Sequence, residues 1–113
     1  MFRIVKIGDR DVPMLAMASV DVYYKRIFNE DPIKAQMKGD EAVVEFAYRM
    51  GFVMAMFAEK RDRKEMLKLN EDNYLDWLDG FYRADLMAAL PDIVNVYESQ
   101  KATSSTEKKR ADA

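Results

Sequence analysis

The chain has 113 residues, of which half are apolar and 34% are charged, a composition that suits one folded domain with one hydrophobic core. Its 18 basic and 20 acidic side chains leave a net charge of −2. That charge provides no positive field for a phosphate backbone and argues against nucleic acid as a partner. Cysteine and histidine do not occur, which excludes disulfides, thiolate metal sites, cysteine nucleophiles and the side chain most often used for proton transfer near neutral pH.

The N-terminal residues predict a β-hairpin. Phe2 and Ile4, and less regularly Val5 and Ile7, are separated by Arg3 and Lys6, a near period-two pattern with β-branched members that indicates a strand over residues 2–7. Residues 8–11 are typical of a turn, in which Gly8 can adopt positive φ. Residues 12–18 form the returning strand, and Pro13 favours an edge position within it. Because this alternation differs from the apolar block of a signal peptide, we expect no targeting segment.

Two helices are predicted next, over residues 20–28 and 41–60. Ser19 can cap the first by accepting hydrogen bonds from N–H groups of its first turn. The first helix ends before Pro32, which cannot continue it. Asp40 can cap the second, which is apolar nearly all round and is therefore expected to be the most buried element.

The most apolar stretch, residues 42–58, does not predict a membrane span. Glu45 and Arg49 interrupt it, and it is too short to cross a bilayer. We therefore expect a soluble protein without a membrane partner. Gly51, inside this stretch, indicates a place where another element approaches closely.

Residues 60–70 break the helical pattern with five basic and two acidic side chains. Asn70 then predicts the start of a short helix over 71–79. Gly80 is well placed to end that helix in the left-handed conformation.

The last part of the domain predicts two helices, over 84–89 and 91–100. Pro91 separates them, because proline is tolerated in the first turn of a helix but not in its interior. Residues 101–113 have no apolar side chain larger than alanine and predict a disordered tail. The expected fold class is α+β and predominantly helical, with the hairpin packed on about four to six helices in a single domain of residues 1–100.

Several charged groups have the residue types of a binding site but not the spacing. Asp72, Asp76 and Asp79 share one helical face, yet a hard-cation site needs about six oxygens that converge from a shaped loop. The basic run at 60–64 is interleaved with acids, and the four glycines are isolated rather than grouped in a phosphate loop. Solvated faces explain these groups, so no metal, cofactor or catalytic residue is predicted.

Apolar and aromatic side chains in the last third of the chain are candidates for binding a partner protein. The aromatic group near one short helix has two interpretations: it docks that helix onto the domain, or it anchors a partner. Nine methionines suit either an irregular core or an adaptable binding surface. The candidate residues are Tyr74, Trp77, Leu78, Phe81, Met87, Val96 and Tyr97.

The order of these segments resembles the tail assembly chaperones of long-tailed phages and prophages of Gram-positive bacteria. The segments that carry the resemblance are Val12–Ser19, the helix with Tyr23 and Tyr24, Ala47–Ala55, Tyr74–Phe81, and Ala89–Tyr97 followed by a tail rich in Ser, Thr and Lys. The resemblance covers almost the whole chain and depends on the order of the segments, since none is specific alone.

The resemblance implies a non-enzymatic role in building the phage tail. Such chaperones coat the tape measure protein, keep it soluble and help to recruit tail tube subunits. It further implies a protein of the host cytoplasm that is not retained in the mature virion, and it leaves self-association open. Two alternatives remain at this stage: a small phage regulatory protein, either DNA-binding or antitoxin-like, and a structural head–tail component.

Overall fold

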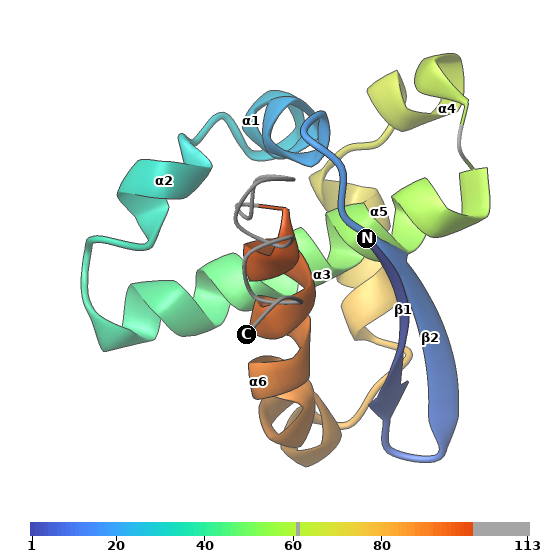
Figure 1. The fold of residues 1–113 in the computed structure, drawn as a ribbon, viewed down its shortest axis with the longest axis vertical. Coiled ribbons are helices and arrows are strands. Elements are labelled where there is room, and N and C mark those ends of the chain that lie inside the picture. Colours follow the sequence, from blue (N-terminus) through green and yellow to red (C-terminus); the bar gives the residue numbers. More distant parts are fainter. Residues whose placement is uncertain (61, 101–113) are drawn as a thin grey trace, which may run out of the picture.

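The alternating N-terminal residues pair as an antiparallel hairpin of β1 (Phe2–Ile7) and β2 (Arg10–Leu15), with Phe2 opposite Leu15. Gly8, the first residue of the two-residue loop, has φ +64°, and this is the position at which a tight hairpin turn takes glycine. The structure is a computed structural model that describes residues 1–60 and 62–100 (Figure 1). The predicted tail, residues 101–113, lies outside the described residues.

The helices that follow confirm the predicted α+β, predominantly helical class. They are α1 (Val20–Phe28), α2 (Pro32–Ala35), α3 (Asp40–Lys60), α4 (Arg63–Leu67), α5 (Glu71–Leu78) and α6 (Arg83–Ser99). The prediction for the start of α5 is confirmed, because Asn70 forms a reciprocal capping box with Asn73. The first helix ends at Asn29, whose φ of +50° turns the chain away from the helix axis.

The core lies around α3, which crosses the middle of the fold (Figure 1). Among the described residues it contributes more buried side chains than any other element, which agrees with the central place predicted for it, although α1 is buried over a larger share of its length; the α3 residues are Phe46, Ala47, Met50, Phe52, Val53, Met54 and Ala55. The inner face of the hairpin covers it with Val5, Ile7, Val12 and Met14. β2 packs mainly on α3, and β1 packs on α6.

Gly51 is the point where three helices meet. A Cβ atom at this position would lie 3.3 Å from Cγ2 of Ile93 in α6 and 3.6 Å from Cη2 of Trp77 in α5. Because Gly51 has no side chain, α6 and α5 can approach α3 closely here, as predicted from the place of this glycine in the apolar stretch.

Pro91 does not separate two helices; that prediction is wrong. α6 is continuous from Arg83 to Ser99, and Pro91 lies inside it. Proline removes one helix hydrogen bond and typically costs about 3 kcal/mol in a helix interior. Here Pro91 is exposed, while Ala89 and Ile93 beside it are buried against the core. Packing on both sides of the proline holds the helix together.

Three local predictions are also wrong. Ser19 has helical backbone angles and makes no side-chain cap. Gly80 does not adopt the left-handed conformation. Its N–H donates a hydrogen bond to the Trp77 carbonyl, and the Phe81 N–H donates one to the Leu78 carbonyl, so the chain continues in a right-handed turn. The segment read as a break contains α4, which begins where the Asp62 carboxylate accepts a 2.8 Å hydrogen bond from the Lys64 N–H.

The substitution Gly51→Leu should lower the free energy of unfolding by on the order of 1–3 kcal/mol, because the new side chain overpacks a site already closed by Ile93 and Trp77. Denaturant melts measure the change. Ala88→Leu is the control, since it adds a leucine at an exposed position of α6. An unchanged midpoint for Gly51→Leu would show that this face of α3 is open.

Candidate functional site

The aromatic cluster predicted near α5 forms part of the core. Tyr74 is buried, and its ring centroid lies 5.0 Å from that of Phe28 and 5.7 Å from that of Phe52. Trp77 is half-buried at 5.9 Å from Phe52. Because both rings contact α3, they fix α5 to the domain.

The end of α5 is also tied to the hairpin. Trp77 and Phe81 form an edge-on pair with ring centroids 5.0 Å apart, and the Arg10 guanidinium lies 4.6 Å from the Phe81 ring. The same guanidinium donates a 3.1 Å hydrogen bond to the Gly80 carbonyl. Half-buried Leu78 packs on the core beside them. Of the two interpretations of the cluster, these contacts favour docking.

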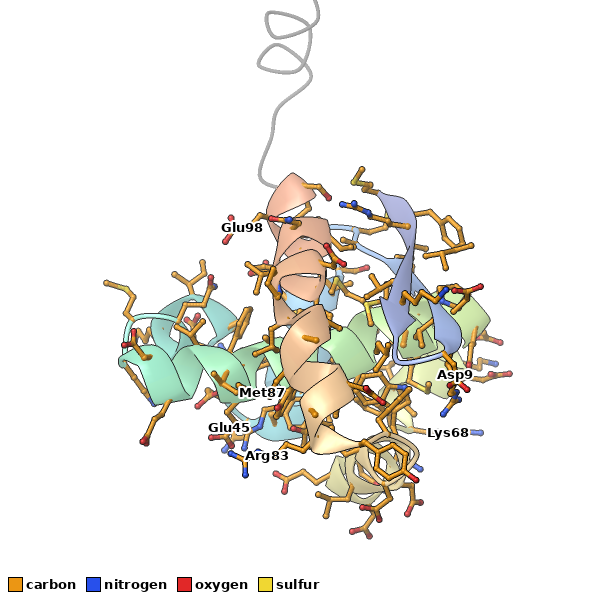
Figure 2. All side chains as sticks on the ribbon, turned by 90° about the horizontal axis from the view of Figure 1, so that it is seen from below. Asp9, Glu45, Lys68, Arg83, Met87 and Glu98 are labelled. Carbon is orange, nitrogen blue, oxygen red and sulfur yellow. The ribbon has the colours of Figure 1, made fainter. Side chains whose placement is uncertain are left out.

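The candidates on α6 separate into two kinds. Val96 and Tyr97 are buried, and the Tyr97 hydroxyl donates a 2.8 Å hydrogen bond to the Asp21 carboxylate. Burial and this bond raise the Tyr97 pKa above its usual value. These two side chains belong to the core and cannot serve as a free binding surface. Met87 is exposed on α6 (Figure 2).

Two more buried tyrosines have raised pKa values. Burial raises the pKa of Tyr74 to about 12. Burial also raises the pKa of Tyr24, and its 2.7 Å hydrogen bond to the Glu30 carboxylate adds to the effect. In each case the neutral phenol is the form that suits the folded state.

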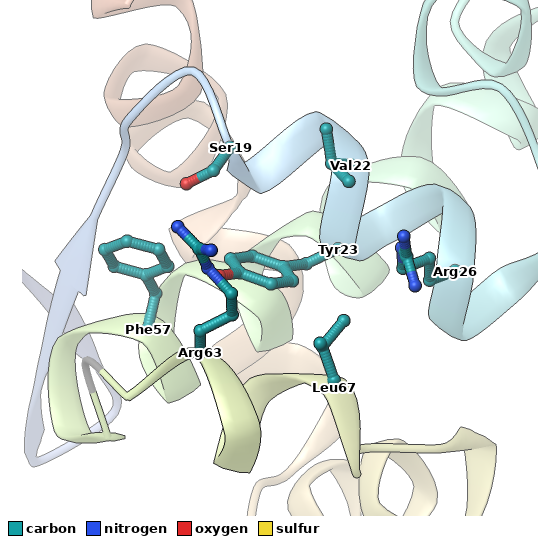
Figure 3. Close-up of a pocket in the computed structure, with 7 residues that line it drawn as sticks. All are labelled: Ser19, Val22, Tyr23, Arg26, Phe57, Arg63 and Leu67. Atoms are coloured by element: carbon teal, nitrogen blue, oxygen red, sulfur yellow. The ribbon is translucent and has the colours of Figure 1, made fainter.

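A groove with a volume of about 490 Å³ lies between α1, the end of α3 and α4. Its floor is made by Tyr23 and Phe57, whose ring centroids are 5.8 Å apart. Val22 on the α1 wall is 52% exposed and Leu67 on the α4 wall is 46% exposed. The side chains that line it are Ser19, Val22, Tyr23, Arg26, Phe57, Arg63 and Leu67 (Figure 3).

The charged groups that line the groove are basic. Arg26 comes from α1 and Arg63 from α4, and Figure 3 shows them to either side of the Tyr23 ring. No acidic side chain is among the described residues that line the groove. The combination of aromatic floor, apolar walls and two guanidinium groups can bind an apolar segment and orient it by charge.

The sequence patterns alone do not predict this groove. The signal present in the sequence is that each wall carries one apolar residue and one arginine, one helical turn apart. These are Val22 and Arg26 on α1, and Arg63 and Leu67 on α4. Such pairs share a helical face. They could not be joined because α4 was not predicted, and its packing beside α1 depends on the tertiary fold.

A second apolar surface lies on the outer face of the hairpin. Phe2 and Ile4 are each about half exposed, opposite Leu15 and Pro13 in the register. Their side chains point away from the core because alternate residues of a strand face opposite sides. These four apolar residues thus share the outer face of the hairpin, where another molecule can contact them.

Within residues 1–60 and 62–100, no helix is long and apolar enough to cross a membrane. In the same residues, no group of three or more acidic side chains is arranged to hold a metal ion. Comparisons of the chain with protein-family models, with curated proteins and with solved structures found no match.

The substitution Trp77→Ala should lower the free energy of unfolding by about 2 kcal/mol, less than for a fully buried tryptophan, because the ring is half-buried against Phe52 and Phe81. Thermal melts followed by circular dichroism measure it. Leu75→Ala, on the exposed side of the same helix, should have little effect. Unchanged stability of Trp77→Ala, together with loss of partner binding, would favour the anchor interpretation instead.

The buried tyrosines predict a loss of stability in alkali. Their folded pKa values lie above the usual 10.0, so the unfolded chain releases these protons first as the pH rises. Their contribution is therefore complete below pH 10 and falls as the pH rises through 10 towards the folded pKa. Denaturant midpoints from about pH 8 to about pH 11 test this. Tyr97→Phe, which cannot ionise at this position, should show a shallower decline over that range; an equal slope would contradict the assignment.

Proposed function

We propose that this protein is a non-enzymatic phage tail assembly chaperone, which binds the tape measure protein, keeps it soluble in the host cytoplasm and helps to bring tail tube subunits to it. The proposal combines the order of the sequence segments with one structural observation, the groove between α1 and α4. The groove is assigned to the tape measure protein.

The shape and chemistry of the groove support this assignment. A tape measure protein is long and helical, and its apolar stripes need cover until the tube is built around it. An amphipathic helix can place such a stripe on the floor formed by Tyr23 and Phe57, between the walls of Val22 and Leu67. This is the helix-in-groove mode of recognition, in which apolar anchors one turn apart enter a preformed surface.

The outer face of the hairpin supports the second half of the proposed role. A protein that recruits one partner to another needs two separate surfaces. The groove is built from α1, α3 and α4, whereas Phe2, Ile4, Pro13 and Leu15 lie on β1 and β2. We assign this face to the tail tube subunit, which can then be held near the tape measure protein at high effective concentration.

The substitution Leu67→Ser should weaken capture of the tape measure protein of the same phage by about tenfold, because it removes one apolar wall of the groove. Co-expression followed by measurement of soluble tape measure protein tests this. Leu75→Ser is the matched control, since Leu75 is a similarly exposed leucine on another short helix outside the groove. Failure of the unaltered chain to capture the tape measure protein would refute the proposed function, and so would its presence in purified virions.

A further inference from the structure

The groove carries a charge pattern that its apolar shape alone does not explain. Arg26 and Arg63 lie on opposite walls, and both are exposed. Among the described side chains, neither groove arginine takes part in an ion pair of the kind that joins Arg49 and Lys38 to Glu30 and Glu45. Two guanidinium groups are therefore available to a molecule that enters the groove.

The acidic side chains near the groove, Glu59 at the end of α3 and Asp21, Asp62 and Glu65 on or next to α1 and α4, do not line it. The Asp21 carboxylate accepts a hydrogen bond from Tyr97, and Asp62 accepts one from the Lys64 N–H at the start of α4. Glu65 also has an interaction partner. The basic side chains of this region, Lys25, Arg26, Arg63, Lys64 and Lys68, are all exposed. In a protein with a net charge of −2, two positive side chains and no negative one thus line this apolar groove.

We infer that the groove binds an amphipathic helix whose apolar stripe is flanked by acidic residues on both sides. The apolar stripe covers Tyr23 and Phe57, and carboxylates on its two flanks reach Arg26 on one wall and Arg63 on the other. Arginine suits this role because its planar fork pairs with a carboxylate through two hydrogen bonds. The inference rests on the proposed function only for the identity of the protein that carries the helix.

Two other occupants fit less well. Residues 101–113 of this chain contain four basic and two acidic side chains, a net charge of the wrong sign for a groove lined by two arginines. A second copy could offer α5, which carries Glu71, Asp72 and Asp76, but Leu75 is the one large apolar side chain of that helix that is exposed. A single leucine covers little of a groove of about 490 Å³. Phosphate groups would leave the aromatic floor uncovered.

The experiment uses the full chain and two synthetic helical peptides that share one leucine stripe. One peptide has glutamate at every position that flanks the stripe, and the other has lysine there. We expect the glutamate peptide to bind about tenfold more tightly, equivalent to about 1.4 kcal/mol, with a difference that shrinks as salt is added. This preference is opposite to the one that the net charge of −2 alone would produce, so it reports on the groove.

Charge reversal supplies the controls. The double variant Arg26→Glu and Arg63→Glu should reverse the preference, whereas Arg3→Glu with Arg83→Glu, the same change of net charge at exposed positions outside the groove, should leave it in place. Equal binding of the two peptides, or no binding, would overturn the inference. If neither peptide binds and the charge reversal at positions 26 and 63 changes the oligomeric state, the groove belongs to a second copy of the chain. That result would also overturn the inference.

The inference and the proposed function can fail separately. A glutamate preference together with no capture of the tape measure protein would sink the chaperone role and leave the acidic-helix specificity standing. If capture of the tape measure protein does not change when Arg26 and Arg63 are replaced by glutamate, the acidic-helix specificity fails and the chaperone role stands.

Discussion

The arrangement of the helices depends on the close approach at Gly51. Because this residue has no side chain, Ile93 of α6 and Trp77 of α5 both reach the backbone of α3 on one side. Successive residues of a helix are turned by 100°, so Phe57, six residues on, faces about 120° away from Gly51. One side of α3 is thereby covered by α5 and α6. The side that carries Phe57 is flanked by α1 and α4, which form the walls of a groove there and leave it open to solvent.

A polar network fixes the α1 wall of this groove. The Glu30 carboxylate, just beyond the end of α1, accepts hydrogen bonds from the Tyr24 hydroxyl at 2.7 Å and from Arg49 of α3 at 3.2 Å. The Arg49 guanidinium also lies 5.0 Å from the Phe28 ring. Charged groups that are partly withdrawn from water in this way hold their partners in one geometry. α1 therefore has a fixed rotation about its axis, which directs Val22 and Arg26 into the groove.

The opposite wall is held by a single buried side chain. Met66 is the buried residue of α4, and the helix has only five residues, Arg63–Leu67. An isolated helix of this length is not stable in water, so α4 owes its position to Met66 and to the Asp62 cap. This wall can adjust to different bound segments more easily than the α1 wall, which suits a partner with many non-identical apolar stripes.

Sequence patterns predicted the elements whose signals are local. The strands follow from alternation, the start of α5 from Asn70, and the burial of α3 from its apolar residues on all sides. The continuity of α6 through Pro91 could not be predicted, because it depends on burial of Ala89 and Ile93 against distant residues.

The candidate site depended still more on tertiary structure. Aromatic residues that make good interface anchors also make good cores, and the sequence does not separate these roles; Tyr74 and Tyr97 are in the core. The groove joins side chains from three segments between Ser19 and Leu67, so neither its floor nor its paired arginines correspond to a contiguous motif.

The openness of the groove bears on how a chaperone of the proposed kind would release its partner. Its wall residues remain about half exposed, and ion pairs at a solvated rim contribute at most about 1 kcal/mol each. One such site would bind weakly, yet many copies along one long tape measure protein would cover it at modest total concentration. Because each contact is weak, tube subunits could displace the copies one at a time. A deeper, closed pocket would bind each stripe more tightly and would oppose that exchange.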